Sequence, residues 1–416
     1  MKRTLLTGNA AAAWGARLAA IDYVPAFPIT PQTEIIETLA EWIDGGVLNA
    51  RLVTLESEHS MLAAAGAAAV TGVRVFTATS SQGLLYGMEM LYNLAGWRAP
   101  LVLVNVSRGL SAPITLEPDH NDVLAARDSG FVQIHCATCQ EVLDNVLLAY
   151  RLAEDGRVRL PVIVNLDGFY LSFTREPVEV PDPAVAKTFL PAFADLGQRF
   201  RGGQASSQAV AVLGGGPYSY FRYQVHLASE QAAAVYTELG EEFGRCFGRH
   251  YKTVETYCCD DAELVLVMIG SFATKAMPAI DRLRQAGHKV GLLRPRLVRP
   301  FPAAELRRLL QGRRGVAVVD QNLSPGQGGI LHAELAATLY GLAERGPLLA
   351  SFVGGLGGRD ISEEEFLQIF EVLQQAVDSG KAPPPRLLFT AEELKQVRRL
   401  QDIAHGGEVG KGEDAS

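Results

Sequence analysis

Residues 101–106 read Leu-Val-Leu-Val-Asn-Val, and their first four positions show no polar alternation. A strand that is covered on both faces has this pattern, and such strands belong to parallel sheets. Similar short apolar runs occur at 52–55, 73–77 and 161–165. The longer helical patterns between these runs cover residues 57–70, 83–95 and 140–153. This βαβ order predicts an α/β fold, a doubly wound layer with right-handed crossovers.

A second βα alternation begins at residues 264–270, which read Leu-Val-Leu-Val-Met-Ile-Gly. Its later strands are expected at 289–293 and 315–319. A long polar helix is expected at 224–243, before this alternation. With 416 residues the chain is too long for one ordinary core, so two or more domains are expected.

The two alternations are separated by residues 176–216, which are rich in Pro, Gly, Gln and Ser. We read this stretch as a connector in which prolines block regular structure; they are Pro177, Pro181, Pro183 and Pro191. The predicted parts are an α/β domain at 1–180, a connector with the long helix at 181–258, a second α/β domain at 259–402 and a mobile tail at 403–416.

The composition excludes several classes of function. Hydrophobic residues make up 48% and charged residues 20%, as in globular proteins, and the net charge is −8. An acidic chain without a run of Lys or Arg is not expected to bind nucleic acid. No stretch approaches the roughly 18 unbroken apolar residues of a membrane span, and no signal peptide is apparent, so the sequence predicts a cytoplasmic protein without membrane contact.

Five scattered cysteines, an odd number, suit a reducing compartment. Cys136 and Cys139 form a Cys-x-x-Cys pair, but only His135 lies near them as a further metal ligand. A metal site needs a second pair or a His at ligand spacing, so we interpret the two thiols as small core or loop residues and predict no metal site.

The segment Phe27-Pro28-Ile29-Thr30-Pro31 precedes a helical pattern that opens at Gln32. Two prolines three positions apart restrict the backbone around Thr30, where a strand ends and a helix begins. Ligands of open α/β sheets bind at such positions, although proline at a first helical turn is common in any protein.

Glu56-Ser57-Glu58-His59-Ser60 leads into a helix of small apolar residues. Poor solvation would raise the pKa of a carboxyl group there toward the range of proton exchange, whereas the positive end of a helix would lower it. The alternative is that Glu56 and Glu58 only complement the helix dipole.

Arg108 follows the buried strand, and Asp119-His120-Asn121-Asp122 comes shortly after. An arginine there can hold a carboxylate by two parallel hydrogen bonds. The alternative is a surface ion pair with Asp119 or Asp122. His120 suits a loop-organising hydrogen-bond role better than that of a nucleophile's base, because no Ser or Cys elbow accompanies it.

Together these segments resemble the alpha chain of the pyruvate:ferredoxin oxidoreductase family, a family of 2-oxoacid:acceptor oxidoreductases that depend on thiamine diphosphate. The resemblance covers most of the chain and implies a pyrimidine-binding domain followed by a transketolase-C-terminal-like domain. The stretches that carry it are Phe27–Pro31, Ser57–Glu58, Thr79–Leu84, Arg108–Pro113, Asp119–Asp122, Leu166–Phe169, Arg294–Pro302 and Gly354–Asp360.

The resemblance implies roles for particular residues. Glu58 would bond to the aminopyrimidine of the coenzyme and promote its imino tautomer. Thr30 and Arg108 would lie near the reacting carbon and the substrate carboxylate. The residues expected to bind the coenzyme are Pro28, Ile29, Thr30, Glu58, Gln82 and Gly83, and those expected to line the substrate pocket are Thr30, Arg108, Asp119 and His120.

Two features of the family's enzymes are absent from this chain. It contains no Gly-Asp-Gly stretch for the diphosphate and Mg²⁺, and no cysteine runs for [4Fe–4S] clusters. The resemblance therefore implies a beta subunit that completes the coenzyme site, gamma and ferredoxin-like subunits that carry the clusters, ferredoxin or another electron acceptor, and coenzyme A as co-substrate.

Several alternatives stay open on the sequence alone. The resemblance favours pyruvate, and Thr30 disfavours oxalate because oxalate-using relatives place arginine there. Phe27, Glu117-Pro118 and Phe173 depart from the pyruvate pattern, which leaves a bulkier aryl acid such as phenylglyoxylate, with NAD as final acceptor, as a second prediction. Two further alternatives are a non-catalytic scaffold subunit and a self-sufficient nicotinamide dehydrogenase.

Overall fold

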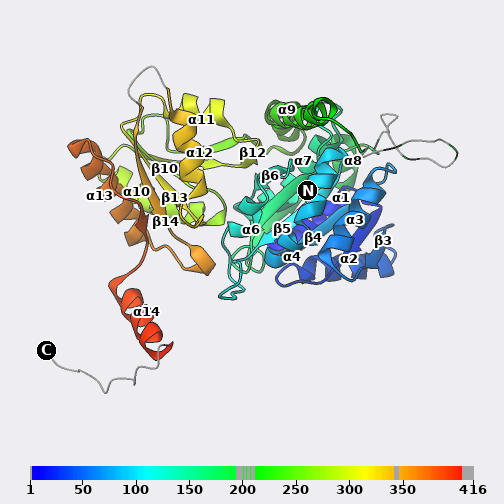
Figure 1. The fold of residues 1–416 in the computed structure, drawn as a ribbon, viewed down its shortest axis with the longest axis horizontal. Coiled ribbons are helices and arrows are strands. Elements are labelled where there is room, and N and C mark those ends of the chain that lie inside the picture. The colour runs from blue at the N-terminus through cyan, green and yellow to red at the C-terminus, as the bar shows by residue number, and fades with distance from the viewer. Residues whose placement is uncertain are drawn as a thin grey trace.

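The computed structural model describes residues 2–193, 200, 203, 207, 211–341 and 346–404. Two mainly parallel sheets lie side by side, each with helices packed on it (Figure 1). The first sheet is blue to cyan and the second is largely yellow to orange, with the green helix α9 above the first (Figure 1). This architecture confirms the predicted α/β fold class.

The first sheet is formed by strands that are parallel except at one edge. In spatial order it contains β12 (Leu297–Arg299), β6 (Val132–His135), β7 (Val162–Asp167), β5 (Val102–Ser107) and β4 (Phe76–Thr79). A parallel pair continues it beyond β4 through a bridge between Tyr23 and Val75, and consists of β2 (Tyr23–Ala26) and β3 (Arg51–Thr54). A separate antiparallel pair is formed by β1 (Lys2–Thr7) and β8 (Arg175–Val180).

The second sheet has six strands, of which only the edge strand β9 runs antiparallel. In spatial order they are β15 (Arg386–Leu387), β14 (Leu348–Val353), β13 (Gly315–Asp320), β10 (Leu264–Val267), β11 (Val290–Pro295) and β9 (Val254–Tyr257). The predicted strands at 264–270, 289–293 and 315–319 correspond to β10, β11 and β13, so the second alternation is confirmed.

The helices connect the strands of both sheets. Those of the first part are α1 (Gly8–Leu18), α2 (Thr33–Asp44), α3 (Glu58–Ala69), α4 (Ser81–Tyr86), α5 (Met88–Gly96), α6 (Asn121–Ala125), α7 (Cys139–Glu154), α8 (Pro183–Phe189) and α9 (Gly215–Phe247). Those of the second part are η1 (Ser271–Lys275), α10 (Ala276–Gln285), α11 (Ala303–Leu310), α12 (Ile330–Leu339), η2 (Leu356–Gly358), α13 (Glu363–Ser379) and α14 (Ala391–Ala404). None of the described helices is both long and apolar enough to cross a membrane.

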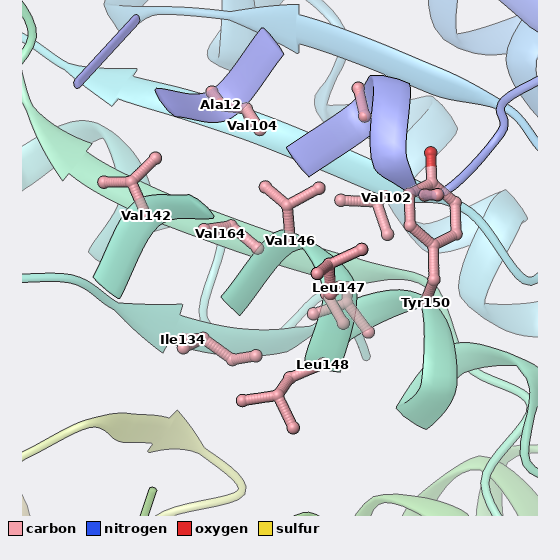
Figure 2. Close-up of a cluster of buried hydrophobic side chains, with 14 of the residues drawn as sticks. Ala12, Val102, Val104, Ile134, Val142, Val146, Leu147, Leu148, Tyr150 and Val164 are labelled. Carbon is pink, nitrogen blue, oxygen red and sulfur yellow. The ribbon is translucent and has the colours of Figure 1, made fainter. Parts of the chain in front are cut away.

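Helix α7 provides the centre of the first core. Its side chains at Val142, Val146 and Leu147 are fully buried against the sheet, where Val104 and Val164 project from neighbouring strands (Figure 2). Fully burying an aliphatic side chain of this size contributes about 1.5–3 kcal/mol. The apolar strands identified in the sequence therefore form a layer that is covered on both faces, as their missing alternation predicted.

The prediction that prolines exclude regular structure from residue 176 onward is wrong for two elements. Pro177 lies in β8 opposite Leu5, in a two-stranded sheet where a missing backbone donor is tolerated at an edge. Pro183 opens α8, and Asp182 caps that helix by accepting from the N–H of Ala184. Most residues between 194 and 210, and the predicted tail from 405 onward, lie outside the described residues.

The single helix predicted at 83–95 is two helices, α4 and α5, which meet at Gly87. A Cβ on Gly87 would overlap the Leu62 side chain, so glycine allows α3 to approach at this point. Glycine is also a poor residue for a helix interior. The strand predicted at 73–77 is shifted to β4, because its ladder with β5 begins at Phe76.

Strand β12 connects the two halves of the chain. It follows β11 of the second sheet, but it pairs with β6 of the first, with Leu297 opposite Ile134 (Figure 1). The chain that leaves the second sheet therefore supplies the edge strand of the first sheet. The sequence patterns did not predict this arrangement. The residue boundaries of the four predicted parts stay a prediction.

Candidate active site

The predicted site residues lie in segments that follow adjacent strands of the first sheet. Thr30 follows β2, Glu58 follows β3, Gln82 follows β4 and Arg108 follows β5. These strands are parallel, so the segments after their carboxyl ends gather at one edge of the sheet. Ligands of open α/β sheets bind at this edge.

The turn that carries Thr30 is held by Gln32. The Gln32 side chain donates from Nε2 to the carbonyl oxygen of Phe27 (3.0 Å), and its backbone N–H donates to the carbonyl of Ile29 (3.1 Å). Pro28 and Thr30 are exposed, whereas Ile29 is partly buried. The Gln32 hydrogen bonds therefore hold the turn from inside, and Thr30 is exposed on it.

Arg108 joins the predicted residues. Its Nη1 donates to the carbonyl oxygen of Thr30 (2.8 Å), and its Nη2 donates to Oε1 of Gln82 (2.9 Å). The residue is 7% exposed, and its buried Nε has no hydrogen-bond partner among the described residues. Burial lowers the pKa of Arg108, although the nearby Asp122 carboxylate acts in the opposite direction. The alternative of a surface ion pair with Asp119 or Asp122 is not seen among the described residues, and a buried cation keeps an unused donor.

Glu58 is the first residue of α3, and it is 5% exposed. Ser57 caps this helix by accepting from the N–H of Ser60. No hydrogen-bond or ion-pair partner of the Glu58 carboxylate is found among the described residues, and neither of its oxygens belongs to the fully buried polar atoms that lack a partner. A buried carboxylate left free of protein partners is available to a ligand.

The Glu58 carboxylate lies against Gly83. A Cβ on Gly83 would overlap Oε1 of Glu58 and would lie 2.6 Å from Oγ1 of Thr79, so only glycine fits at this position. The Thr79 hydroxyl is buried and also lacks a partner. Three polar groups without a protein partner therefore lie near the carboxyl ends of these strands: the Glu58 carboxylate, the Thr79 hydroxyl and Nε of Arg108. Arg108 is linked to this region by its hydrogen bond to Gln82. Sequence reasoning did not assign a role to Thr79, the last residue of β4.

Asp119 and His120 lie where the two parts of the chain meet. The N–H of His120 donates to the carbonyl of Gln321 (2.8 Å), and Oδ2 of Asp119 accepts from the N–H of Gly357 (3.4 Å). Among the described contacts, none joins either side chain to the Arg108 guanidinium. Their predicted role in the substrate pocket has no geometric support here and stays a prediction.

The His120 ring is fully buried and bonds through Nε2 to Oδ1 of Asp167 (2.7 Å). The other oxygen of Asp167 accepts from the N–H of Ser271 (2.8 Å) and from its hydroxyl. Burial alone would lower the pKa of His120, but Asp167 raises it above its usual value. His120 therefore organises a contact between the two parts, which agrees with its predicted hydrogen-bond role. No pattern in the sequence pointed to Asp167 or Ser271 as its partners.

Cys136 and Cys139 are free and buried. Burial raises the pKa of both thiols, so they are held in the neutral form. Within the described ranges, no three His, Cys, Asp or Glu side chains converge in a way that could hold a metal ion. The two cysteines pack as core residues, because both contribute to the hydrophobic cluster of the first sheet.

Residues 14–241 match the protein family described as pyruvate flavodoxin/ferredoxin oxidoreductase, thiamine diphosphate-binding. Residues 262–366 match the pyruvate:ferredoxin oxidoreductase core domain II. The first match alone covers more than half of the chain.

The chain belongs to the pyruvate:ferredoxin oxidoreductase family.

Named relatives place it among the alpha-type chains of this family. It is 42% identical to pyruvate synthase subunit PorA of Methanothermobacter thermautotrophicus, over 88% of this chain and 94% of the relative. It is 38% identical to PorA of Pyrococcus abyssi, over 92% and 96% of the two chains. It is also 40% identical to ketoisovalerate oxidoreductase subunit VorA of Pyrococcus horikoshii, over 91% and 95%.

Solved structures support the fold. The 2-oxoglutarate:ferredoxin oxidoreductase of Magnetococcus marinus, solved with 2-oxoglutarate, coenzyme A and succinyl-CoA bound, aligns with a TM-score of 0.69 at 20% identity. The alignment covers 89% of this chain and 65% of that longer chain. A split-gene transketolase, an inactive beta4 tetramer, aligns with a TM-score of 0.51 at 12% identity, over 88% and 97% of the chains. The predicted fold, with a thiamine-diphosphate-type domain followed by a transketolase-C-terminal-like domain, is confirmed.

Proposed function

We propose that this chain is the alpha subunit of a 2-oxoacid:ferredoxin oxidoreductase complex and contributes the pyrimidine-binding half of its coenzyme site. The complex oxidatively decarboxylates a 2-oxo acid to an acyl-CoA. The observation that carries the proposal is the carboxylate of Glu58, a residue that is 5% exposed and lies at the carboxyl edge of the sheet without a protein partner among the described residues. Family membership supports the same assignment.

The residues present fit the pyrimidine end of thiamine diphosphate. Gly83 leaves the space that the Glu58 carboxylate needs, and the unpartnered Thr79 hydroxyl lies beside it. Glu58 would hold the pyrimidine through a ring nitrogen, and Gly83 would let the ring approach the backbone. A ring with polar nitrogen atoms would satisfy groups that the protein itself leaves unsatisfied.

When bound, the coenzyme supplies a carbon nucleophile and an electron sink for decarboxylation. Glu58 holds or releases a proton at the pyrimidine nitrogen. Arg108 binds the carboxylate of the 2-oxo acid through the N–H groups of Nη1 and Nη2 that do not donate to Thr30 or Gln82. Thr30 lies next to this cation, because its own carbonyl accepts from Arg108, and it orients the acid.

A partner chain completes the site in this proposal. The sequence has no Gly-Asp-Gly stretch, so a beta subunit would hold the diphosphate and Mg²⁺. It also lacks the cysteine runs of [4Fe–4S] ligation, so gamma and ferredoxin-like subunits would carry electrons to ferredoxin. Coenzyme A would accept the acyl group.

Pyruvate is the first candidate substrate, because pyruvate synthase subunits are among the relatives that match nearly the whole chain. A branched or bulkier 2-oxo acid is the second candidate, because ketoisovalerate oxidoreductase subunits match at a similar identity. The aryl acid phenylglyoxylate, with NAD as final acceptor, is the most distant option. The nicotinamide dehydrogenase alternative is not retained, since the family match points elsewhere.

A purified complex of this chain with its native partners tests the proposal. Ferredoxin or viologen reduction is measured with pyruvate, 2-oxoisovalerate and phenylglyoxylate, with and without coenzyme A and thiamine diphosphate. We expect turnover that requires both cofactors and is fastest with one aliphatic 2-oxo acid. Absence of turnover with every acid would contradict the proposal, whereas preference for phenylglyoxylate would replace only the substrate.

A further inference from the structure

Asp122 is a buried carboxylate that lies between the two loops of the candidate active site. It is the second residue of α6 and has no exposed surface. Its two oxygens accept five hydrogen bonds, all from neutral donors. Oδ2 accepts from the Ser81 N–H (3.0 Å), Nδ2 of Asn105 (3.1 Å) and the Arg108 N–H (3.3 Å), and Oδ1 accepts from the Ser107 hydroxyl (2.6 Å) and the Val123 N–H (2.6 Å).

These donors come from the segments that carry the candidate site. Ser81 opens α4 immediately before Gln82, and Arg108 follows the last residue of β5. The Ser81 hydroxyl lies 2.6 Å from Oε1 of Gln82 and 3.0 Å from the carbonyl oxygen of Gly109 and can donate its one proton to either, so it lies between the same two segments. One carboxylate therefore holds both backbones at the positions from which the Gln82 and Arg108 side chains meet.

Only a carboxylate satisfies this arrangement. Each of the five groups around Asp122 donates a hydrogen bond, and an ionised Asp is acceptor-only. An asparagine of the same shape would point N–H groups at some of these donors. Burial raises the pKa of Asp122 against the effect of its hydrogen bonds, so keeping the charged form is costly. No cationic side chain pairs with it in the described part of the chain, since Arg108 reaches it through the backbone alone.

We propose that Asp122 is a positioning residue, which holds the Arg108 guanidinium and the Gln82 amide in the geometry that binds the carboxylate of the 2-oxo acid. The inference rests on the proposed function and gives a positioning role to a residue that the sequence offered only as a possible surface ion-pair partner of Arg108 and to which the comparisons assigned no role. Asp122 touches no reacting group. It acts through the backbone N–H groups of Ser81 and Arg108, and its loss would move the guanidinium without removing it.

The test uses Asp122→Asn in the complete purified complex, with Asp144→Asn as the matched control. Asp144 is also fully buried and accepts from Arg249, Tyr251 and Gln140, but these contacts lie within the packing of α7. We expect Asp122→Asn to raise the KM for the 2-oxo acid by at least ~10-fold, as for lost hydrogen bonds to a charged ligand. The concentration of thiamine diphosphate that gives half-maximal activity should change by less than about 3-fold, because Glu58 is left in place.

In the control, Asp144→Asn, the KM for the 2-oxo acid and the half-saturating concentration of thiamine diphosphate should both stay near those of the wild type. If Asp122→Asn fails to assemble, Ser107→Ala decides the question, because it removes one donor and keeps the carboxylate; its KM should rise by about 3-fold. A fall in kcat at unchanged KM, or equal changes in the control, would overturn the inference. An inactive wild-type complex would instead refute the proposed function, so the two failures are distinguishable.

Discussion

Glu58 and Glu141 are both buried glutamates near the start of a helix, but they have opposite surroundings. Glu58 opens α3 and has no hydrogen-bond or ion-pair partner among the described residues. Glu141 lies in the first turn of α7, and its carboxylate is surrounded by cations. Arg294 donates to both of its oxygens (2.5 and 3.0 Å), Arg296 donates to one (3.1 Å), and the Ala137 N–H donates as well (2.8 Å).

The Glu141 cluster joins the two halves of the molecule. Arg294 belongs to β11 of the second sheet, and Arg296 lies between β11 and β12. Arg296 also donates to Glu255 (2.7 Å) and stacks on the Tyr251 ring at 4.9 Å. Burial alone would raise the pKa of Glu141, but the two guanidinium charges lower it to about 2.

The difference separates a structural carboxylate from a functional one. When a buried charge is fully paired by protein groups, removing it leaves those groups uncompensated. The substitution then lowers the free energy of unfolding. When the carboxylate of a buried residue has no protein partner, as at Glu58, a ligand is the remaining partner. This contrast also argues against a scaffold role, in which an unpaired Glu58 would serve no purpose.

The largest expected effect is on catalysis at the unpaired carboxylate. Glu58→Gln should lower turnover of the purified complex by ~10²–10⁴-fold, because a group that transfers protons is lost. Glu56→Gln is the matched control: that neighbour is exposed and accepts from the Ser60 hydroxyl, so its turnover should stay within about 2-fold of wild type. Full turnover of the Glu58 variant would support the scaffold alternative.

The paired carboxylate should respond in stability instead. Glu141→Gln is expected to destabilise the chain by about 3–5 kcal/mol, because Arg294 and Arg296 lose their common partner. Chemical denaturation measures this difference. Glu305→Gln, which breaks an exposed pair with Arg308, serves as control and should cost no more than about 1 kcal/mol. Equal losses in the two variants would show that the Glu141 cluster does not hold the halves together.

The third expected effect concerns substrate binding at Arg108. Arg108→Lys keeps the charge but loses the guanidinium fork that donates to Thr30 and Gln82. The KM for the 2-oxo acid should rise by about 10-fold, with a smaller change in kcat. Steady-state kinetics of the complex checks this expectation, and an unchanged KM would remove Arg108 from the carboxylate site.

The smallest expected effect is a pH dependence of the Glu141 contribution. The folded pKa of Glu141 is about 2, below its usual value of 4.5. Its stabilisation is therefore fully present above the unfolded pKa and is lost as the pH falls from about 4.5 through about 2. Unfolding curves of wild type and Glu141→Gln should differ by a constant amount above pH ~5 and converge below it. A gap that does not narrow in acid would contradict the assigned pKa.

Local patterns predicted much of the site. Thr30 and Arg108 were identified because each follows a strand, whose carboxyl end is where ligands of such sheets bind, and Glu58 because it opens a helix of small apolar residues; the family resemblance then implied their roles. The structure brings Thr30, Gln82 and Arg108 into direct contact and places Glu58 against Gly83. Partners distant in sequence could not be predicted, as for Asp122, which appeared only as a possible ion-pair partner of Arg108.

The sequence by itself determined the alternation of strands and helices, because a strand that is buried on both faces is an unbroken apolar run, and such a run can be recognised in the sequence. Tertiary structure alone decided that β12 joins the first sheet and that Ser271 bonds Asp167, which precedes it by 104 residues. It alone also decided that the Glu141 carboxylate is paired with arginines, whereas the Glu58 carboxylate has no protein partner among the described residues. Hydrophobic periodicity is a local property, whereas the partner of a buried polar group depends on which strand ends the fold brings together.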